Sequence, residues 1–234
     1  MGYRDIGISN FISKHINSSN SKQIFIDIGA NQGLITLQAH NDLCNLDRIK
    51  FICIEPVSIF FNNLKSNIRE ANSKASFTLL NIGLGNLSNA GASVFISKRN
   101  STSTQSLDLA LDVRKDLIEE KVQIISVFNF IKTYLEPLSY DYITVKSDTD
   151  GSDIAIFDAL INSTIGFKIT CYVLEIILTG VTETECSVLL KNCNNFSQWL
   201  FIDRNNNSTL PKNIITGILK SNQGYVGDLY LTNV

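Results

Sequence analysis

The stretch Gln23–Gly33, QIFIDIGANQG, joins a short apolar run to a glycine-containing turn. Its first part, Ile24–Ile28, is apolar except for Asp27, which is typical of a buried strand in a parallel sheet. The turn Gly29–Gly33 follows, and the apolar residues after it begin a helical pattern at Leu34. A strand, a glycine turn and a helix N-terminus in this order predict the ligand-binding corner of a doubly wound α/β sheet.

The glycine spacing and the acid indicate which ligand this corner would hold. Gly29 and Gly33 give G-x-x-x-G, whereas a dinucleotide pyrophosphate is cradled by G-x-G-x-x-G. Glycine lets the backbone approach a ligand closely and adopt positive φ. Asp27 at the end of the strand argues against a phosphate and for a cationic ligand. The alternative is a tight strand–helix turn that binds nothing.

A second carboxylate stands at the end of the next predicted strand. Lys50–Ile54 is the strand, Glu55-Pro56 follows it, and Val57–Ala71 has the apolar spacing of an amphipathic helix. Rossmann-like folds bind a ribose diol through an acid at this strand tip. An acid favoured by the helix macrodipole is the alternative for Glu55, but its spacing from Asp27 favours the ribose role.

Predicted strands alternate with predicted helices along the rest of the chain, with no internal repeat and no Pro/Gly-rich linker. This pattern predicts an α/β fold with a mostly parallel sheet and helices on both faces. We expect an N-terminal helical segment over 1–22 and the main domain over 23–234. Ser76–Leu80 is the third strand, ending in Asn81-Ile82, where such folds place adenine. We expect Asp108–Lys121 to be partly helical.

Composition narrows the classes of partner. The 234 residues are 44% hydrophobic and 18% charged, with a net charge of −2, so the chain is globular and no basic excess points to nucleic acid. The five cysteines show no C-x-x-C spacing, which favours a reducing compartment. No signal peptide or apolar run long enough for a membrane span is evident. We therefore expect a cytoplasmic protein without a transmembrane segment.

A cluster of acids follows the predicted strand Asp141–Val145. Period-two alternation would put Lys146, Asp148 and Asp150 on one side if the strand stayed extended. Asp148 is the best candidate for a catalytic base, with Lys146 and Asp150 beside it, because neither His15 nor His40 is expected near the ligand. The alternative is that these acids only turn the chain and cap the next helix.

Small polar residues fill Lys98–Ser106, KRNSTSTQS, between two predicted elements. Loops in such places often carry recognition. We expect either a mobile substrate loop or an ordinary connector here.

Five stretches together resemble the FkbM-type family of S-adenosylmethionine (SAM)-dependent methyltransferases, from about Gln23 to Ile177. They are FIDIGANQG, IEPVSIFFNNLKSNI, STSTQSL, ITVKSDTDGSDIAIF and VLEI. The block from Lys146 to Asp153 is the most specific; the family pattern there is approximately K-I-D-x-E-G-x-E. Ser147, Asp150 and Asp153 depart from that pattern, and Ile176-Ile177 replaces a His that often follows the acid matched by Glu175.

The resemblance implies a class I methyltransferase fold with a seven-stranded sheet of order 3-2-1-4-5-7-6, its last strand antiparallel. It implies methyl transfer from SAM to oxygen, commonly on a sugar or glycan acceptor. Asp27 and Glu55 would supply the acids for the cofactor. The expected cofactor-binding residues are Asp27, Gly29, Ala30, Asn31, Gly33, Glu55, Pro56, Asn81 and Ile82.

Two other functions stay open. A nucleotide-binding oxidoreductase is disfavoured by the glycine spacing and by the lack of a Tyr-x-x-x-Lys pair or a suitable His, and a non-catalytic Rossmann-like domain is the other alternative. We expect no bound metal, although Asp148, Asp150 and Glu175 are hard oxygen donors of the kind that Mg²⁺ or Ca²⁺ takes. The expected partner is a small-molecule or glycan acceptor.

Overall fold

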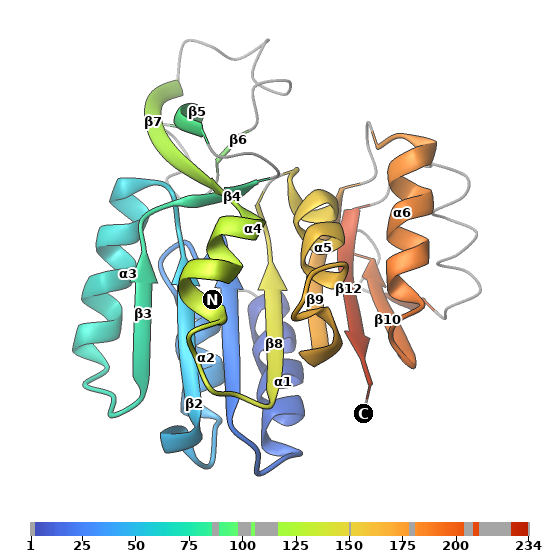
Figure 1. The fold of residues 1–234 in the computed structure, drawn as a ribbon. Coiled ribbons are helices and arrows are strands. Elements are labelled where there is room, and N and C mark those ends of the chain that lie inside the picture. Colours follow the sequence, from blue (N-terminus) through green and yellow to red (C-terminus); the bar gives the residue numbers. More distant parts are fainter. Residues whose placement is uncertain are drawn as a thin grey trace.

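The computed structural model describes residues 3–85, 89–97, 104–105, 117–149, 151–177, 181–203, 208–210 and 226–233. In the described part, a large twisted sheet is covered by helices on both faces, and a smaller sheet lies above the ends of its strands (Figure 1). The described part thus has the α/β architecture with helices on both faces of a sheet that the sequence predicts.

The large sheet has the strand order β11-β10-β12-β9-β8-β1-β2-β3. Strands β1, β2, β3, β8 and β9 are parallel, whereas β12 is antiparallel to β9 and β10. Without β11 this is the expected order 3-2-1-4-5-7-6; β11 adds an eighth strand at the edge. The strands are β1 (Gln23–Ile28), β2 (Ile49–Ile54), β3 (Ser76–Leu80), β8 (Tyr142–Ser147), β9 (Ile169–Ile177), β10 (Gln198–Asp203), β11 (Ser208–Leu210) and β12 (Val226–Thr232).

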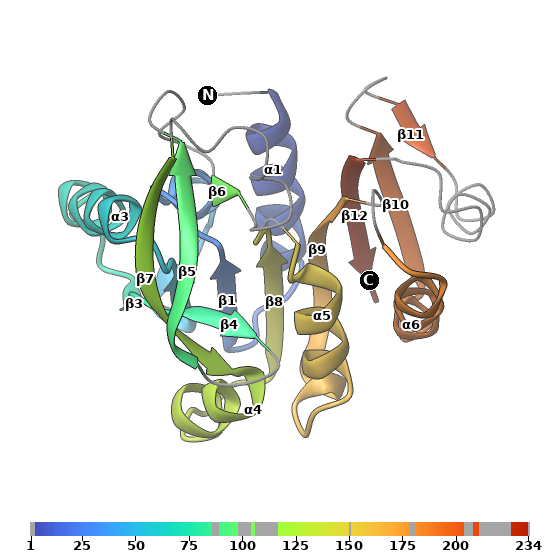
Figure 2. The same cartoon turned by 90° about the horizontal axis from the view of Figure 1, so that it is seen from above.

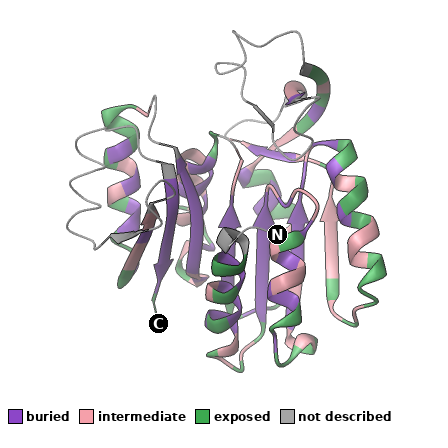
Figure 3. Cartoon of the chain, turned by 180° about the vertical axis from the view of Figure 1, so that it is seen from behind, coloured by how far each residue is buried: buried purple, intermediate pink, exposed green. Residues whose placement is uncertain are grey.

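Helices pack on the two faces because side chains alternate along the strands. Ile8, Ile12 and Ile16 of α1 pack against Phe25 and other residues of one face. The opposite face packs against α4, α5 and α6 through a larger apolar cluster. Figure 3 shows that the strands between these layers are mostly buried. The helices are α1 (Tyr3–Asn17), α2 (Leu34–Asn41), α3 (Ser58–Glu70), α4 (Val127–Phe130), α5 (Asp153–Ile161) and α6 (Glu183–Cys193), with the short turns η1 (Leu46–Arg48), η3 (Ile131–Leu135, a π-helix) and η4 (Gly166–Lys168).

The second sheet, of order β4-β7-β5-β6, lies above the carboxyl ends of the parallel strands (Figures 1 and 2). This sheet contacts the start of α3, because Val94 and Ile96 of β5 pack against Val57 and Phe60. Glu120 adds a polar link by accepting a hydrogen bond from Ser58 N at 2.8 Å. Its strands are β4 (Gly83–Gly85), β5 (Asn89–Ser97), β6 (Thr104–Gln105) and β7 (Leu117–Ser126).

One predicted segment lies only partly within the described residues of this region. Asp108–Lys121 was expected to be partly helical, but its described part, 117–121, belongs to strand β7. The cause is pairing with β5, in which Ser93 lies opposite Lys121 and Phe95 opposite Glu119. Glu119 and Lys121 therefore form the exposed face of a two-stranded ribbon.

Candidate functional site

The glycine turn after β1 lies at the carboxyl edge of the sheet. Gly29, Asn31 and Gly33 have positive φ values of 70°, 52° and 82°. A Cβ on Gly29 would overlap the carbonyl oxygen of Asp148, and one on Gly33 would overlap the side chain of Leu64. The two glycines are thus required by close packing within the protein as well as by the turn itself.

Asp27 is buried beneath this turn and is held by two other elements. Its Oδ2 accepts a hydrogen bond from Thr36 Oγ1 of α2 at 2.5 Å, and its Oδ1 lies 3.1 Å from Lys146 Nζ of β8. Lys146 Nζ also donates to the carbonyl oxygen of Gly29 at 2.8 Å. Only 1% of Asp27 and 3% of Lys146 are exposed, so this ion pair is shielded from solvent and fixes the first residue of the turn.

Glu55 occupies the tip of β2 and links the glycine turn to α3. Its Oε2 accepts from Asn31 N at 2.8 Å and its Oε1 accepts from Val57 N at 2.9 Å. Burial of the carboxyl raises the pKa of Glu55 to about 7, against the opposing effects of these two N–H donors and of Lys146. Asn81, after β3, donates from Nδ2 to the carbonyl oxygens of Glu55 and Pro56, both at 2.9 Å.

The turn after β8 brings Asp148 against the glycine turn. Asp148 N donates to Ile28 O at 3.1 Å, and the Asp148 side chain is half-buried. The next residue, Thr149, donates from both its backbone N and its Oγ1 to Asp153 Oδ2, at 3.1 and 3.0 Å. Asp27, Gly29, Lys146 and Asp148 therefore meet at one place on the sheet edge.

The extended strand on which the alternation of Lys146, Asp148 and Asp150 depended does not reach Asp148. Strand β8 ends at Ser147, so Lys146 points beneath the glycine turn while Asp148 belongs to the following turn. Asp150 lies outside the described residues, as does the polar loop Lys98–Ser106 except for Thr104 and Gln105 of β6.

The remaining expected cofactor residues lie around Glu55 and the turn. Ala30 is buried beside Leu64 of α3, Pro56 is half-buried, and Ile82 packs at the edge of the larger apolar cluster. Sequence reasoning did not assign a role to Thr36, Asp153 or Glu120. Thr36 carried a weak signal, since it lies on the first turn of the helix after Gly33 and faces the strand.

The two histidines are structural. His15, in the last turn of α1, contacts the sheet, with Nε2 3.0 Å from Thr170 Oγ1 and Nδ1 3.2 Å from Thr232 Oγ1. His40 Nε2 lies 2.6 Å from Ser73 Oγ. Neither ring reaches the glycine turn.

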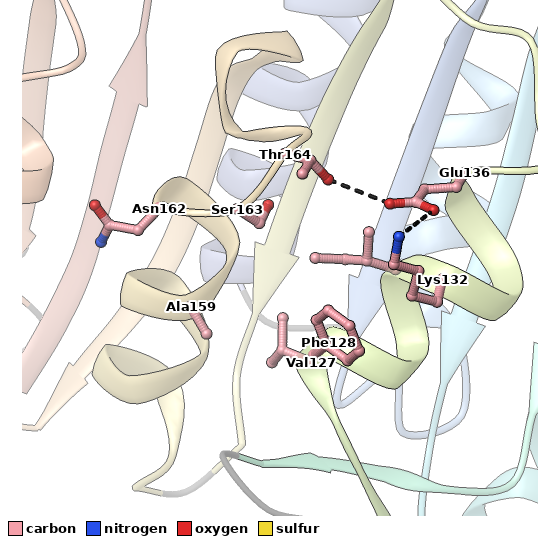
Figure 4. A pocket seen from close by; sticks show the side chains of 9 residues that line it. Val127, Phe128, Lys132, Glu136, Ala159, Asn162, Ser163 and Thr164 are labelled. Atoms are coloured by element: carbon pink, nitrogen blue, oxygen red, sulfur yellow. Dashed lines mark hydrogen bonds and ion pairs between the residues drawn. The ribbon is translucent and has the colours of Figure 1, made fainter.

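A separate groove of about 390 Å³ lies between α4–η3 and α5, away from the strand ends (Figure 4). Phe128 and Ala159 form part of its wall, and Glu136 at its rim binds Lys132 Nζ at 3.0 Å and Thr164 Oγ1 at 3.3 Å. It contains none of the expected site residues.

Comparison with known proteins defines the fold. No protein-family model matches the chain, and no curated protein matches it. The structure of a SAM-dependent methyltransferase from Agrobacterium tumefaciens is similar with a TM-score of 0.52 and 7% identity, over 100% of this chain and 63% of that one. This likeness and the strand order establish the class I methyltransferase fold.

Two further solved structures resemble the chain more distantly. The O-methyltransferase TomG from Streptomyces achromogenes, in complex with SAM, has a TM-score of 0.48 and 12% identity, over 97% of this chain and 79% of that one. An O-methyltransferase from Bacillus cereus, in complex with SAH, has a TM-score of 0.47 and 10% identity, over 97% and 80%. Among the described residues, no helix is long and apolar enough to cross a membrane.

Proposed function

We propose that the chain is a SAM-dependent O-methyltransferase that acts on a hydroxyl of a sugar or glycan-type acceptor. The FkbM-type motifs support this acceptor class, and the class I fold supports the cofactor. A non-catalytic or nucleotide-binding Rossmann-like domain is the alternative. No disulfide joins any of the five cysteines, which supports a reducing, cytoplasmic setting.

One observation carries the proposal: the Glu55 carboxylate lies at the tip of β2 beside the glycine turn, held by Asn31 N and Val57 N. A carboxylate has about four lone-pair positions, and these two bonds use one on each oxygen. The remaining positions suit the two hydroxyls of a ribose. The carboxylate oxygens of Glu55 can therefore accept hydrogen bonds from the ribose of an adenosyl cofactor. Asn81, Pro56 and Ile82 at the tips of β2 and β3 would border its adenine.

When bound, SAM supplies a methyl group carried on a sulfonium. The chain's own part is to position the acceptor oxygen in line with that methyl and to take the hydroxyl proton. We assign the proton to the carboxylate of Asp148, a half-buried residue whose backbone carbonyl lies against Gly29. Asp150 would assist it. Lys146 and Asp27 hold the turn in shape, because a buried ammonium bound to a carboxylate and a carbonyl is poorly placed to accept a proton.

Isothermal titration with SAM, SAH and NAD tests the cofactor. We expect SAM and SAH to compete for one site and NAD not to bind. Glu55→Ala should weaken SAM binding by about 1–3 kcal/mol, the range for a hydrogen bond to a charged group. Glu70→Ala, which removes an exposed acid on the far end of α3, should leave the affinity unchanged. NAD binding without SAM binding would instead support a nucleotide-binding domain.

Transfer of tritium from methyl-labelled SAM to a mixture of methyl glycosides tests the reaction. Labelled ether products and an activity lost in Asp148→Asn would support both the acceptor class and the base. If SAM binds tightly but no label moves to any hydroxyl acceptor, the non-catalytic alternative gains support.

A further inference from the structure

The turn that carries Asp148 is fixed from two sides. On the sheet side, Asp148 N donates to Ile28 O, and the Asp148 carbonyl packs against the Cα of Gly29. On the helix side, both donors of Thr149 reach one oxygen of Asp153. One contact with Ile28 of β1, one with Gly29 and two with Asp153 of α5 therefore determine where the Asp148 side chain begins.

Asp153 is placed unusually for an acid in the first turn of a helix. The common role of such an acid is to accept N–H groups of its own helix or to interact with its dipole. Asp153 Oδ2 instead accepts from Thr149, which precedes the helix by four positions. Ser152 is the N-cap residue of α5 and makes no side-chain capping bond. The Asp153 carboxylate thus binds the segment that precedes α5 and does not cap the helix.

A buried polar cluster surrounds the other oxygen of Asp153. Ser147 from β8 and Tyr172 from β9 lie beside it, and the exposed fractions of Ser147, Asp153 and Tyr172 are 1%, 4% and 0%. The Ser147 hydroxyl is close enough to Asp153 and Tyr172 to lower the pKa of each, against the larger effect of burial. However, among the described residues Asp153 Oδ1, Ser147 Oγ and Tyr172 OH make no hydrogen bond of normal length and angle. Phe157 packs edge-on against Tyr172, with 4.7 Å between ring centroids, and closes the cluster.

Holding a carboxylate in such a place is costly. Burial raises the pKa of Asp153 to about 6, and the nearby charge of Asp148 contributes to the shift. An acid that only capped a helix would lie at the surface at lower cost. The two bonds to Thr149 are the main compensation that the described contacts offer.

We propose that Asp153 is a positioning residue of the reaction site, which holds the Thr149 backbone and hydroxyl and so fixes the Asp148 turn against Gly29. Ser147 and Tyr172 belong to the buried surroundings of the Asp153 carboxyl. The role assigned to Asp148 rests on the proposed methyl transfer, whereas the mechanical link from Asp153 to Thr149 does not.

Amide hydrogen exchange of Thr149 in the protein without added ligand tests the link. Asp153→Ala removes the acceptor, so the Thr149 amide should exchange at least about tenfold faster, as expected for a locally opened segment. Asp153→Asn keeps an oxygen for both donors and should restore protection to within about threefold of the wild type. The exchange rates of core amides such as that of Ile26 report any change in global stability. The Thr149 exchange rates are corrected for that change.

Asp158→Ala is the matched control, because Asp158 lies on the same helix but binds Asn192 and Asn162 instead of the turn. It should leave Thr149 exchange unchanged after the same correction. Unchanged protection in Asp153→Ala, or an equal loss in Asp158→Ala, would overturn the proposal. If Asp153→Ala does not fold, Thr149→Val decides: it removes the Oγ1 bond, and an unchanged amide protection together with full activity would reject the link.

Methyl transfer to the glycoside mixture adds a readout on the reaction. Turnover should fall at least about tenfold in Asp153→Ala and recover in Asp153→Asn, while SAH affinity stays within about threefold in both. Turnover that survives in Asp153→Ala despite a mobile Thr149 would refute the positioning role. Absence of SAH binding and transfer in the wild type would reject the proposed function, whereas the exchange result would still decide the Asp153–Thr149 link.

Discussion

Lys146 Nζ and Asp27 Oδ1 lie 3.1 Å apart beneath the glycine turn, in an ion pair almost completely removed from solvent. The same ammonium donates to Gly29 O, so the pair ties β8 to the start of the turn. A buried pair contributes little net stability compared with apolar residues, but loss of one partner leaves an uncompensated charge. The role of the Lys146–Asp27 pair in this protein is to fix the position of the glycine turn.

Lys146→Met should therefore destabilise the fold by about 3–5 kcal/mol, the usual result of removing one partner of a buried pair. Urea unfolding followed by circular dichroism measures the change. Lys132→Met is the control, since Lys132 pairs with Glu136 on the surface and should cost under about 1 kcal/mol. The double variant Asp27→Asn/Lys146→Met should regain part of the loss; a single variant as stable as the wild type would contradict the buried pair.

Gly29→Ala should abolish SAH binding and destabilise the protein. The residue has φ of 70°, and its added Cβ would overlap the Asp148 carbonyl, so the turn and the Asp148 segment must separate. Calorimetric titration with SAH and thermal unfolding check both effects. Gly7→Ala is the matched control, because a Cβ there meets no atom within 4 Å; in the middle of α1 it should stabilise by up to about 1 kcal/mol. Binding retained in Gly29→Ala would show that the turn can rearrange.

The residues at strand ends were predictable from sequence, whereas their partners were not. Asp27 and Glu55 follow apolar runs, and parallel strands place their carboxyl ends at one edge. The bond between Lys146 and Gly29 joins residues 117 positions apart, and no local pattern encodes it. Alternation from Lys146 could not place the Asp148 side chain, because the strand ends at Ser147. The first residues of β7, 117–121, were assigned to a partly helical segment because Glu119 and Lys121 face solvent in a ribbon, so their charges resembled those of a helix surface.

His15 predicts how the fold responds to acid. Burial lowers the pKa of His15 from 6.5 to about 4, so the folded protein prefers the neutral ring that binds Thr170 and Thr232. The associated stability is complete above pH 6.5 and is lost as the pH falls toward 4, by up to roughly 3 kcal/mol from the shift. Free energies of unfolding at pH 7 and 4.5 measure it. His15→Gln should show a correspondingly smaller loss over this range, and an equal loss would assign the acid sensitivity to other groups.

Glu55 predicts a pH dependence of cofactor binding. Its pKa is raised from 4.5 to about 7 by burial, so its contribution to the stability of the ligand-free protein is complete below pH 4.5 and is lost as the pH rises through 7. A ribose donates to the carboxylate and therefore favours the ionised form. SAM affinity should rise about tenfold from pH 6 to pH 8 and then level off, and binding near pH 7 should release a proton.

Titration of SAM at each pH, in buffers with different ionisation enthalpies, measures both the affinity and the released proton. Glu55→Gln cannot ionise, so its weaker affinity should be independent of pH across this range and its binding should release no proton from this site. Glu70→Gln, at an exposed position of the same helix, should keep the wild-type pH profile. A pH profile in Glu55→Gln equal to that of the wild type would mean that another group titrates and that Glu55 does not hold the ribose.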